Sequence, residues 1–172
     1  MAQDRATLTA AVGAAMADLQ AAYDDRDRAL AEALGVNRTD LRCLDLIVRG
    51  GAQTATELGA RLHLTRGSMT TLIDRLESAG YVQRHGDPDH GRRKLITPTR
   101  RLAEVLAPLL KPAIENGHAR LAKYDETELR LILDFLQDTL SGQSVVVEAI
   151  RGRPVTSTPS ASRRRSAPPR DR

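Results

Sequence analysis

The chain has 172 residues, of which 41% are apolar and only 2% aromatic, and its formal net charge is +4. This length supports one ordinary hydrophobic core, and the dominance of Ala and Leu over β-branched and aromatic residues favours a mainly helical fold. Because there is no uncharged apolar run of about 18 residues and no basic-then-apolar leader, we expect no membrane span, no secretion signal and a cytoplasmic protein.

The positive charge is concentrated in two segments. Residues 151–172 carry seven Arg and one Asp, which leaves the rest of the chain slightly acidic. Within that rest, residues 61–101 hold nine Arg or Lys against four Asp or Glu. We therefore predict a localised basic face on an acidic body. Residues 151–172 are also rich in Pro, Ser and Thr and poor in core-forming residues, which predicts a disordered basic tail.

Two helices are predicted at the start of the chain. Residues 6–34 form an Ala-rich amphipathic stretch that ends before Gly35. Charged residues at 24–28 interrupt its apolar stripe, which indicates a solvated stretch or a bend. Asn37 is an N-cap candidate for a second helix that ends at the glycines of residues 50–51.

A pair of shorter helices follows. Thr54 and Glu57 have the spacing of a capping box, which predicts a helix that begins there and runs to about Leu62. Thr65 offers a second cap for a helix from residue 66 to about residue 78, stopped by Gly80.

The pattern then changes to that of a β-hairpin. Residues 81–84 and 93–97 predict two short strands, because the segment between them, residues 86–91, is dense in turn-forming residues. We interpret this hairpin as a small wing beside the preceding pair of helices.

Two more helices are predicted after the hairpin. Thr99 caps the first, and Pro108 and Pro112 should kink it because each lacks a backbone donor. Asp125 with Glu128 opens the last strong helix. Its apolar residues follow helical spacing and form one stripe: Leu129, Ile132, Leu133, Leu136 and Leu140.

Residues 54–80 satisfy the packing pattern of a helix-turn-helix, which requires apolar residues at fixed offsets and a small residue where the helices nearly touch. Gly59 supplies the small residue, and His63 stands where a left-handed backbone usually selects Gly and where His is tolerated. Counted from Ala55, the apolar positions four, eight, ten, fifteen and eighteen are Leu58, Leu62, Leu64, Met69 and Leu72.

With its apolar residues turned inward, the helix from residue 66 would expose short polar and basic side chains. Arg can bond bidentately to guanine, and Ser and Thr can bond bases or phosphates. The amino end of the helix favours a phosphate, and the basic residues around the hairpin suit the minor groove. The predicted DNA-binding residues are Thr65, Arg66, Gly67, Ser68, Thr70, Thr71, Arg75, Arg84, Arg92, Arg93 and Lys94.

Residues 54–99 resemble the winged-helix domain of the MarR (multiple antibiotic resistance regulator) family. In that family the wing reads roughly Asp-Pro-x-Asp-x-Arg and is followed by Leu-Thr at the start of the next helix. Here the Asp-Pro of residues 87–88 matches, Arg92 falls on the wing arginine and Thr99 falls on the capping threonine, whereas His90 replaces the second aspartate.

The resemblance implies a mainly α fold: a winged helix-turn-helix with a small β-hairpin wing and an all-α dimerisation region from both chain ends. Residues 36–99 would form the DNA-binding domain, and residues 1–35 with 100–150 the dimerisation region. It further implies a transcriptional regulator, a repressor that binds double-stranded DNA at a pseudo-palindromic operator as a homodimer. A small molecule, often phenolic in this family, would change the spacing of the two recognition helices.

Other interpretations remain open. A helical protein-interaction adaptor and a metal- or redox-sensing regulator of the same fold are the main alternatives. We expect no resident cofactor, no bound metal and no enzymatic activity, since no nucleophile with a base, carboxylate pair or phosphate-binding glycine loop has convincing spacing. The lone Cys43 forms no intrachain disulfide, and its structural role is favoured over a sensing role. The weaker metal-site candidates are His63, His85, His90, Asp87 and Asp89.

Overall fold

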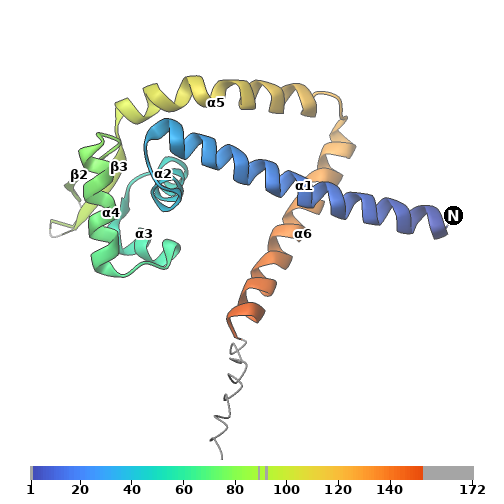
Figure 1. The fold of residues 1–172 in the computed structure, drawn as a ribbon, viewed down its shortest axis with the longest axis horizontal. Helices are drawn as coiled ribbons and strands as arrows, with labels where there is room; N and C mark the ends of the chain where they lie inside the picture. The colour runs from blue at the N-terminus through green and yellow to red at the C-terminus, as the bar shows by residue number, and fades with distance from the viewer. Residues whose placement is uncertain (1, 89, 92, 153–172) are drawn as a thin grey trace, which may run out of the picture. The chain divides into compact units, whose positions relative to one another are not determined.

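The computed structural model describes residues 2–88, 90–91 and 93–152. Its elements in chain order are α1 (Ala2–Leu34), α2 (Arg38–Gly50), β1 (Gln53–Thr54), α3 (Ala55–Leu62), α4 (Arg66–Ser78), β2 (Val82–Gly86), β3 (Lys94–Pro98), α5 (Arg100–Leu121) and α6 (Glu126–Arg151) (Figure 1). They belong to two compact units, Met1–Asn116 and Gly117–Arg172. The mainly α winged-helix fold is thereby confirmed. Among the described helices, none combines the length and apolar character needed to cross a membrane.

The predicted helix caps are present. The side chain of Asn37 accepts the N–H of residue 40 at 2.9 Å, and α2 begins at the next residue after the cap. The capping boxes of Thr54 with Glu57 and of Asp125 with Glu128 are both complete. These local hydrogen bonds satisfy amides that a helix cannot satisfy internally, which explains why the starts of α2, α3 and α6 were predictable.

The long helices α1 and α5 are each continuous. α1 begins at Ala2 and stays helical through residues 24–28, so that the charged segment is a solvated stretch of a continuous helix. α5 likewise continues through Pro108 and Pro112, and Thr99 caps it by accepting the N–H of Leu102 at 3.3 Å. The described part of the last helix, α6, extends to Arg151.

The wing belongs to a three-stranded antiparallel sheet in the order β1-β3-β2. Ile96 in the central strand lies opposite Arg84 of β2 and Gln53 of β1. β2 and β3 are shifted by one or two residues from the predicted strands. β1 has only two residues, too few for a readable alternation, so nothing in the sequence predicts it.

One hydrophobic core, in the unit Met1–Asn116, joins α1 through α5. The helix-turn-helix offsets are confirmed, because Leu58, Met69 and Leu72 are buried and the other two positions are half-buried against them. Tyr81 ties the end of α4 to the end of α1, since its hydroxyl donates to the Leu34 carbonyl at 2.9 Å. The buried members are Leu34, Cys43, Leu44, Ile47, Leu58, Met69, Leu72, Ile73, Leu76, Tyr81, Val82, Ile96 and Leu102.

Candidate nucleic-acid interface

The turn between α3 and α4 fixes the angle at which α4 leaves the core. His63 adopts the predicted left-handed conformation with φ 55° and ψ 41°, and the N–H of Leu64 donates to the Gly59 carbonyl at 2.9 Å. A Cβ at Gly59 would lie 3.4 Å from the Leu64 oxygen and 3.8 Å from Cγ of Met69, so a methyl group would make ordinary contacts there. Gly59 therefore lies where α3 packs closely against the turn and against α4.

α4 has one buried and one exposed face. Met69, Leu72, Ile73 and Leu76 are buried along the inner face. At the amino end, the hydroxyl of Thr65 accepts the N–H of residue 68 at 3.3 Å and caps the helix. Five of the predicted DNA-binding residues lie on the exposed face or at its start: Arg66, Gly67, Ser68, Thr70 and Thr71.

The threonine hydroxyls on this face are bonded to their own helix. Thr70 donates to the carbonyl of Arg66 at 3.0 Å, and Thr71 donates to the carbonyl of Gly67 at 3.2 Å. Because the hydroxyl hydrogens are used in this way, the exposed Thr groups present oxygen lone pairs and methyl groups to the outside.

Among the described residues that line this surface, Arg66 and Lys94 carry positive charges that no acidic side chain pairs with. Both side chains are exposed, and within the described part of the chain neither forms an ion pair. They line a common groove of about 870 Å³ between α3, the first half of α4 and the start of β3. A guanidinium and an ammonium in one groove form a suitable binding site for phosphate or for a base edge.

Arg93 lies in the same groove but faces an acidic partner. Its Nη2 is 3.4 Å from Oε1 of Glu57, and both side chains are about half exposed. Hydrogen bonds from the backbone N–H and then the hydroxyl of Thr54 lower the pKa of Glu57 from its ordinary value of 4.5, and Arg93 lowers it further. Glu57 is therefore ionised at neutral pH and partly neutralises Arg93.

Arg84 and Arg75 are bound within the protein. Arg84 on β2 bridges Asp74 and Glu77 of α4, each at 2.5 Å. Arg75 binds the buried carboxylate of Asp40 on α2 through two hydrogen bonds. These acids were not predicted as partners. The spacing of Asp74 and Glu77 on one helix face was a readable signal, whereas no local pattern links residue 40 to residue 75.

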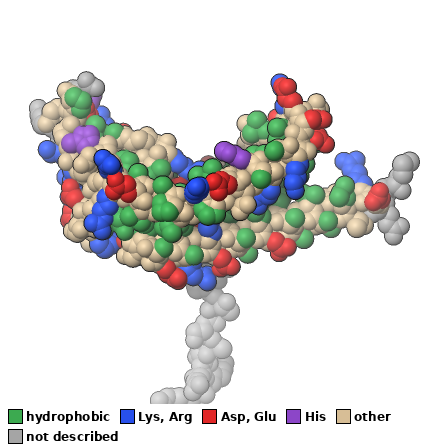
Figure 2. Space-filling model, turned by 90° about the horizontal axis from the view of Figure 1, so that it is seen from above, with side chains coloured by type: hydrophobic (Ala, Val, Ile, Leu, Met, Phe, Trp, Pro, Cys, Tyr) green, Lys and Arg blue, Asp and Glu red, His purple; other side chains and the backbone are tan. Residues whose placement is uncertain are grey.

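Acidic and basic groups lie side by side at several places on the visible surface. Figure 2 shows acidic side chains directly beside basic ones, in keeping with the ion pairs of the described residues. Arg92, the predicted wing arginine, lies outside the described residues, as does Asp89. The described part of the hairpin loop is closed by the N–H of Asp87, which donates to the Arg93 carbonyl at 3.0 Å.

Several of the residues considered as redox or metal sensors are buried in the core or bonded to other parts of the protein. Cys43 is fully buried, and burial raises the pKa of its thiol from 9.0 to about 12, with a further increase from Asp40. His85 Nε2 is 3.1 Å from the hydroxyl of Thr97, and His63 caps α3. Within residues 2–88, 90–91 and 93–152, no three His, Cys, Asp or Glu side chains gather as possible metal ligands.

The surroundings of Cys43 give a testable expectation. A buried thiol whose pKa is about 12 has almost no thiolate at pH 8, so iodoacetamide should alkylate it far more slowly in the native protein than in urea. Mass spectrometry of time points would measure both rates. Native alkylation as fast as in the unfolded chain would contradict the structure.

Proteins of similar sequence are transcriptional regulators. A sequence profile of the MarR family matches residues 34–93. The chain is 41% identical over 109 residues to the uncharacterized HTH-type transcriptional regulator YcgE of Bacillus subtilis, covering 63% of this chain and 71% of YcgE. It is 38% identical over 58 residues to YkoM of the same organism, but that match spans only 38% of YkoM.

Solved structures share the fold at low sequence identity. A mutant of MepR from a multidrug-resistant clinical isolate of S. aureus matches with a TM-score of 0.60 at 16% identity, covering 74% of this chain and 94% of that one. A MarR family protein from Bacillus stearothermophilus matches with a TM-score of 0.59 at 17% identity, covering 79% and 95% of the two chains.

Proposed function

Because the chain belongs to the MarR family of transcriptional regulators, we propose that it is a sequence-specific repressor that binds double-stranded DNA at a pseudo-palindromic operator as a homodimer. The observation that carries this proposal is the exposed polar and basic face of α4, which four buried apolar side chains hold in place. Another MepR mutant from S. aureus with the same fold, at a TM-score of 0.51, has been solved bound to an oligodeoxyribonucleotide.

The proposed contacts divide into base-reading and phosphate-binding residues. Arg66 begins α4 with an exposed guanidinium, and Thr70 lies one turn further along the same face, so these two residues read bases in the major groove. Lys94, at the start of β3, binds phosphate together with Arg93. We assign the same role to Arg92, which lies outside the described residues. Thr65 and Ser68 place the amino end of α4 against the phosphate backbone of the duplex.

The proposal of a homodimer is supported by apolar side chains of α1 and α6 that are exposed in a single chain. On α6, Leu133 is 54% exposed, Leu136 48% and Leu140 70%. On α1, Leu8 and Leu19 are also largely exposed. Exposed leucines that repeat at helical spacing require a partner surface, and a second copy of the chain supplies one in a two-fold arrangement.

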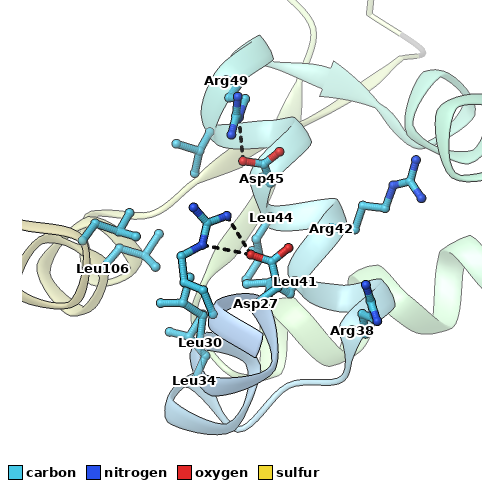
Figure 3. A pocket seen from close by; sticks show the side chains of 13 residues that line it. Asp27, Leu30, Leu34, Arg38, Leu41, Arg42, Leu44, Asp45, Arg49 and Leu106 are labelled. Carbon is cyan, nitrogen blue, oxygen red and sulfur yellow. Dashed lines mark hydrogen bonds and ion pairs between the residues drawn. The ribbon is translucent and has the colours of Figure 1, made fainter. Parts of the chain in front are cut away.

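An effector site is supported by a pocket of about 450 Å³ between α1, α2 and the first turns of α5 (Figure 3). Its apolar wall comes from all three helices and includes Leu30, Leu41 and Leu106. The Arg26–Asp27 and Arg49–Asp45 ion pairs also line it. An apolar wall with a few polar groups suits a small amphipathic molecule such as a phenolic acid, which we propose as the effector class.

DNA binding is tested with a duplex enriched by the protein from a randomised library and with a scrambled duplex of the same composition. Arg66→Ala and Thr70→Ala should each weaken binding to the enriched duplex roughly tenfold while changing binding to the scrambled one much less. Lys94→Ala should weaken binding to both duplexes by a similar factor, and the salt dependence of binding should fall by about one released ion. Lys111→Ala, at an exposed site on α5, is the control.

The outcome against the DNA-binding proposal is equally clear. If the protein enriches no sequence, or if Arg66→Ala, Thr70→Ala and Lys94→Ala all bind the enriched duplex as the unmodified protein does, α4 and the wing do not form the interface.

Dimer formation is tested on α6. The double variant Leu136→Glu/Leu140→Glu introduces charges where we propose an apolar contact, so its mass by sedimentation equilibrium should fall from two chains to one. Gln137→Glu introduces one such charge at an exposed polar position of the same helix and should leave the mass at two chains. Equal masses for the double variant and the unmodified protein would exclude this face.

The effector pocket is tested with 4-hydroxybenzoate as the probe. The compound should raise the unfolding temperature of the protein, and Leu41→Trp, which fills the pocket, should abolish that increase. Leu109→Trp, an exposed position on α5 outside the pocket lining, is the matched control and should retain it. An increase of the same size in Leu41→Trp would place the compound elsewhere.

A further inference from the structure

An ion pair within the core unit connects α2 with α4. The side chain of Asp40 is only 2% exposed, and both of its carboxylate oxygens accept hydrogen bonds from Arg75. Nε of Arg75 is 3.0 Å from Oδ2, and Nη2 is 2.6 Å from Oδ1. Asp40 stands in the first turn of α2, where a negative charge is favoured, and Arg75 stands in the last turn of α4.

The geometry limits what Arg75 can do at a DNA surface. The Nε and Nη2 edge of the guanidinium binds Asp40, so any contact of Arg75 with a base would have to use the remaining donors on Nη1 and Nη2, in an orientation that Asp40 sets. Leaving Asp40 would strand a buried carboxylate without a partner, which is unfavourable in a protein interior. Although half of the Arg75 side chain is exposed, this edge of its guanidinium is therefore used inside the protein.

We propose that Asp40 is a positioning residue for DNA recognition: it binds Arg75 and thereby fixes the orientation of α4 against α2. This inference rests on the proposed function and changes the role of Arg75 from a base contact to an anchor. Arg66, at the other end of α4, has no ion-pair partner among the described residues and keeps its donors for the duplex. The two arginines of α4 thus have different tasks.

The pair has the properties expected of an orienting contact. Two hydrogen bonds with the planar guanidinium specify both the distance and the angle between the two side chains. In the described part of the chain, no buried side-chain nitrogen or oxygen lacks a hydrogen-bond partner, so Asp40 is fully satisfied by this arrangement.

The test is a double-mutant cycle with Asp40→Asn, Arg75→Gln and the double variant, measured on the enriched and scrambled duplexes. If the pair acts as a unit, each single variant should reduce the ratio of the affinity for the enriched duplex to that for the scrambled duplex roughly tenfold. The double variant should reduce this ratio by no more than either single variant does. The salt dependence should stay unchanged, since no phosphate contact is removed. Glu104→Gln, which removes an exposed acid from a surface pair on α5, should keep the ratio.

Two outcomes overturn the inference. If Asp40→Asn keeps the affinity ratio while Arg75→Gln loses it, or if Arg75→Gln reduces the salt dependence by about one ion, Arg75 contacts DNA directly. Circular dichroism and thermal unfolding would establish that each variant is folded, and Asp40→Asn alone decides the question if Arg75→Gln does not fold. Failure of the unmodified protein to enrich any duplex would instead refute the proposed function, and this inference with it.

Discussion

The packing of four apolar side chains along one face of α4 is the constraint on which the rest of the molecule depends. Met69, Leu72, Ile73 and Leu76 are all buried, so the opposite face is presented to the outside in a defined rotation. Truncating one such side chain to Ala typically costs about 2–5 kcal/mol, against a total stability of about 5–15 kcal/mol for a domain. The position of the polar face is thus maintained by a large share of the folding free energy.

Ion pairs add to the positioning of α4, which the apolar packing already defines. Of the basic residues near α4 and the wing, Arg75, Arg84 and Arg93 all face acidic partners within the protein. These pairs orient the helix and the strands against each other and reduce the net field of the surface. Among the described residues of this surface, Arg66 and Lys94 form no ion pair, and they are the cations that we propose for contact with a duplex.

The division between what was and was not predictable follows sequence distance. Capping boxes join residues three apart, and the packing offsets from Ala55 lie within two adjacent helices and the turn between them, so both are visible in a single sequence. The Asp40–Arg75 pair joins residues 35 apart and depends on how α2 meets α4, which no local pattern encodes. β1 is likewise defined only by its partner strand, because pairing with Ile96 and Leu95 is what makes it a strand.

The hydrogen bonds of Thr70 and Thr71 determine the chemical character of the middle of α4. Because both hydroxyl hydrogens point back to helix carbonyls, this part of the surface offers acceptors and methyl groups, and Arg66 contributes donors at one end. Amino groups of adenine and cytosine and the methyl group of thymine complement such a surface. If α4 binds a duplex as we propose, a guanine suits the position beside Arg66, and an adenine or cytosine amino group or a thymine methyl group suits the positions beside the threonines.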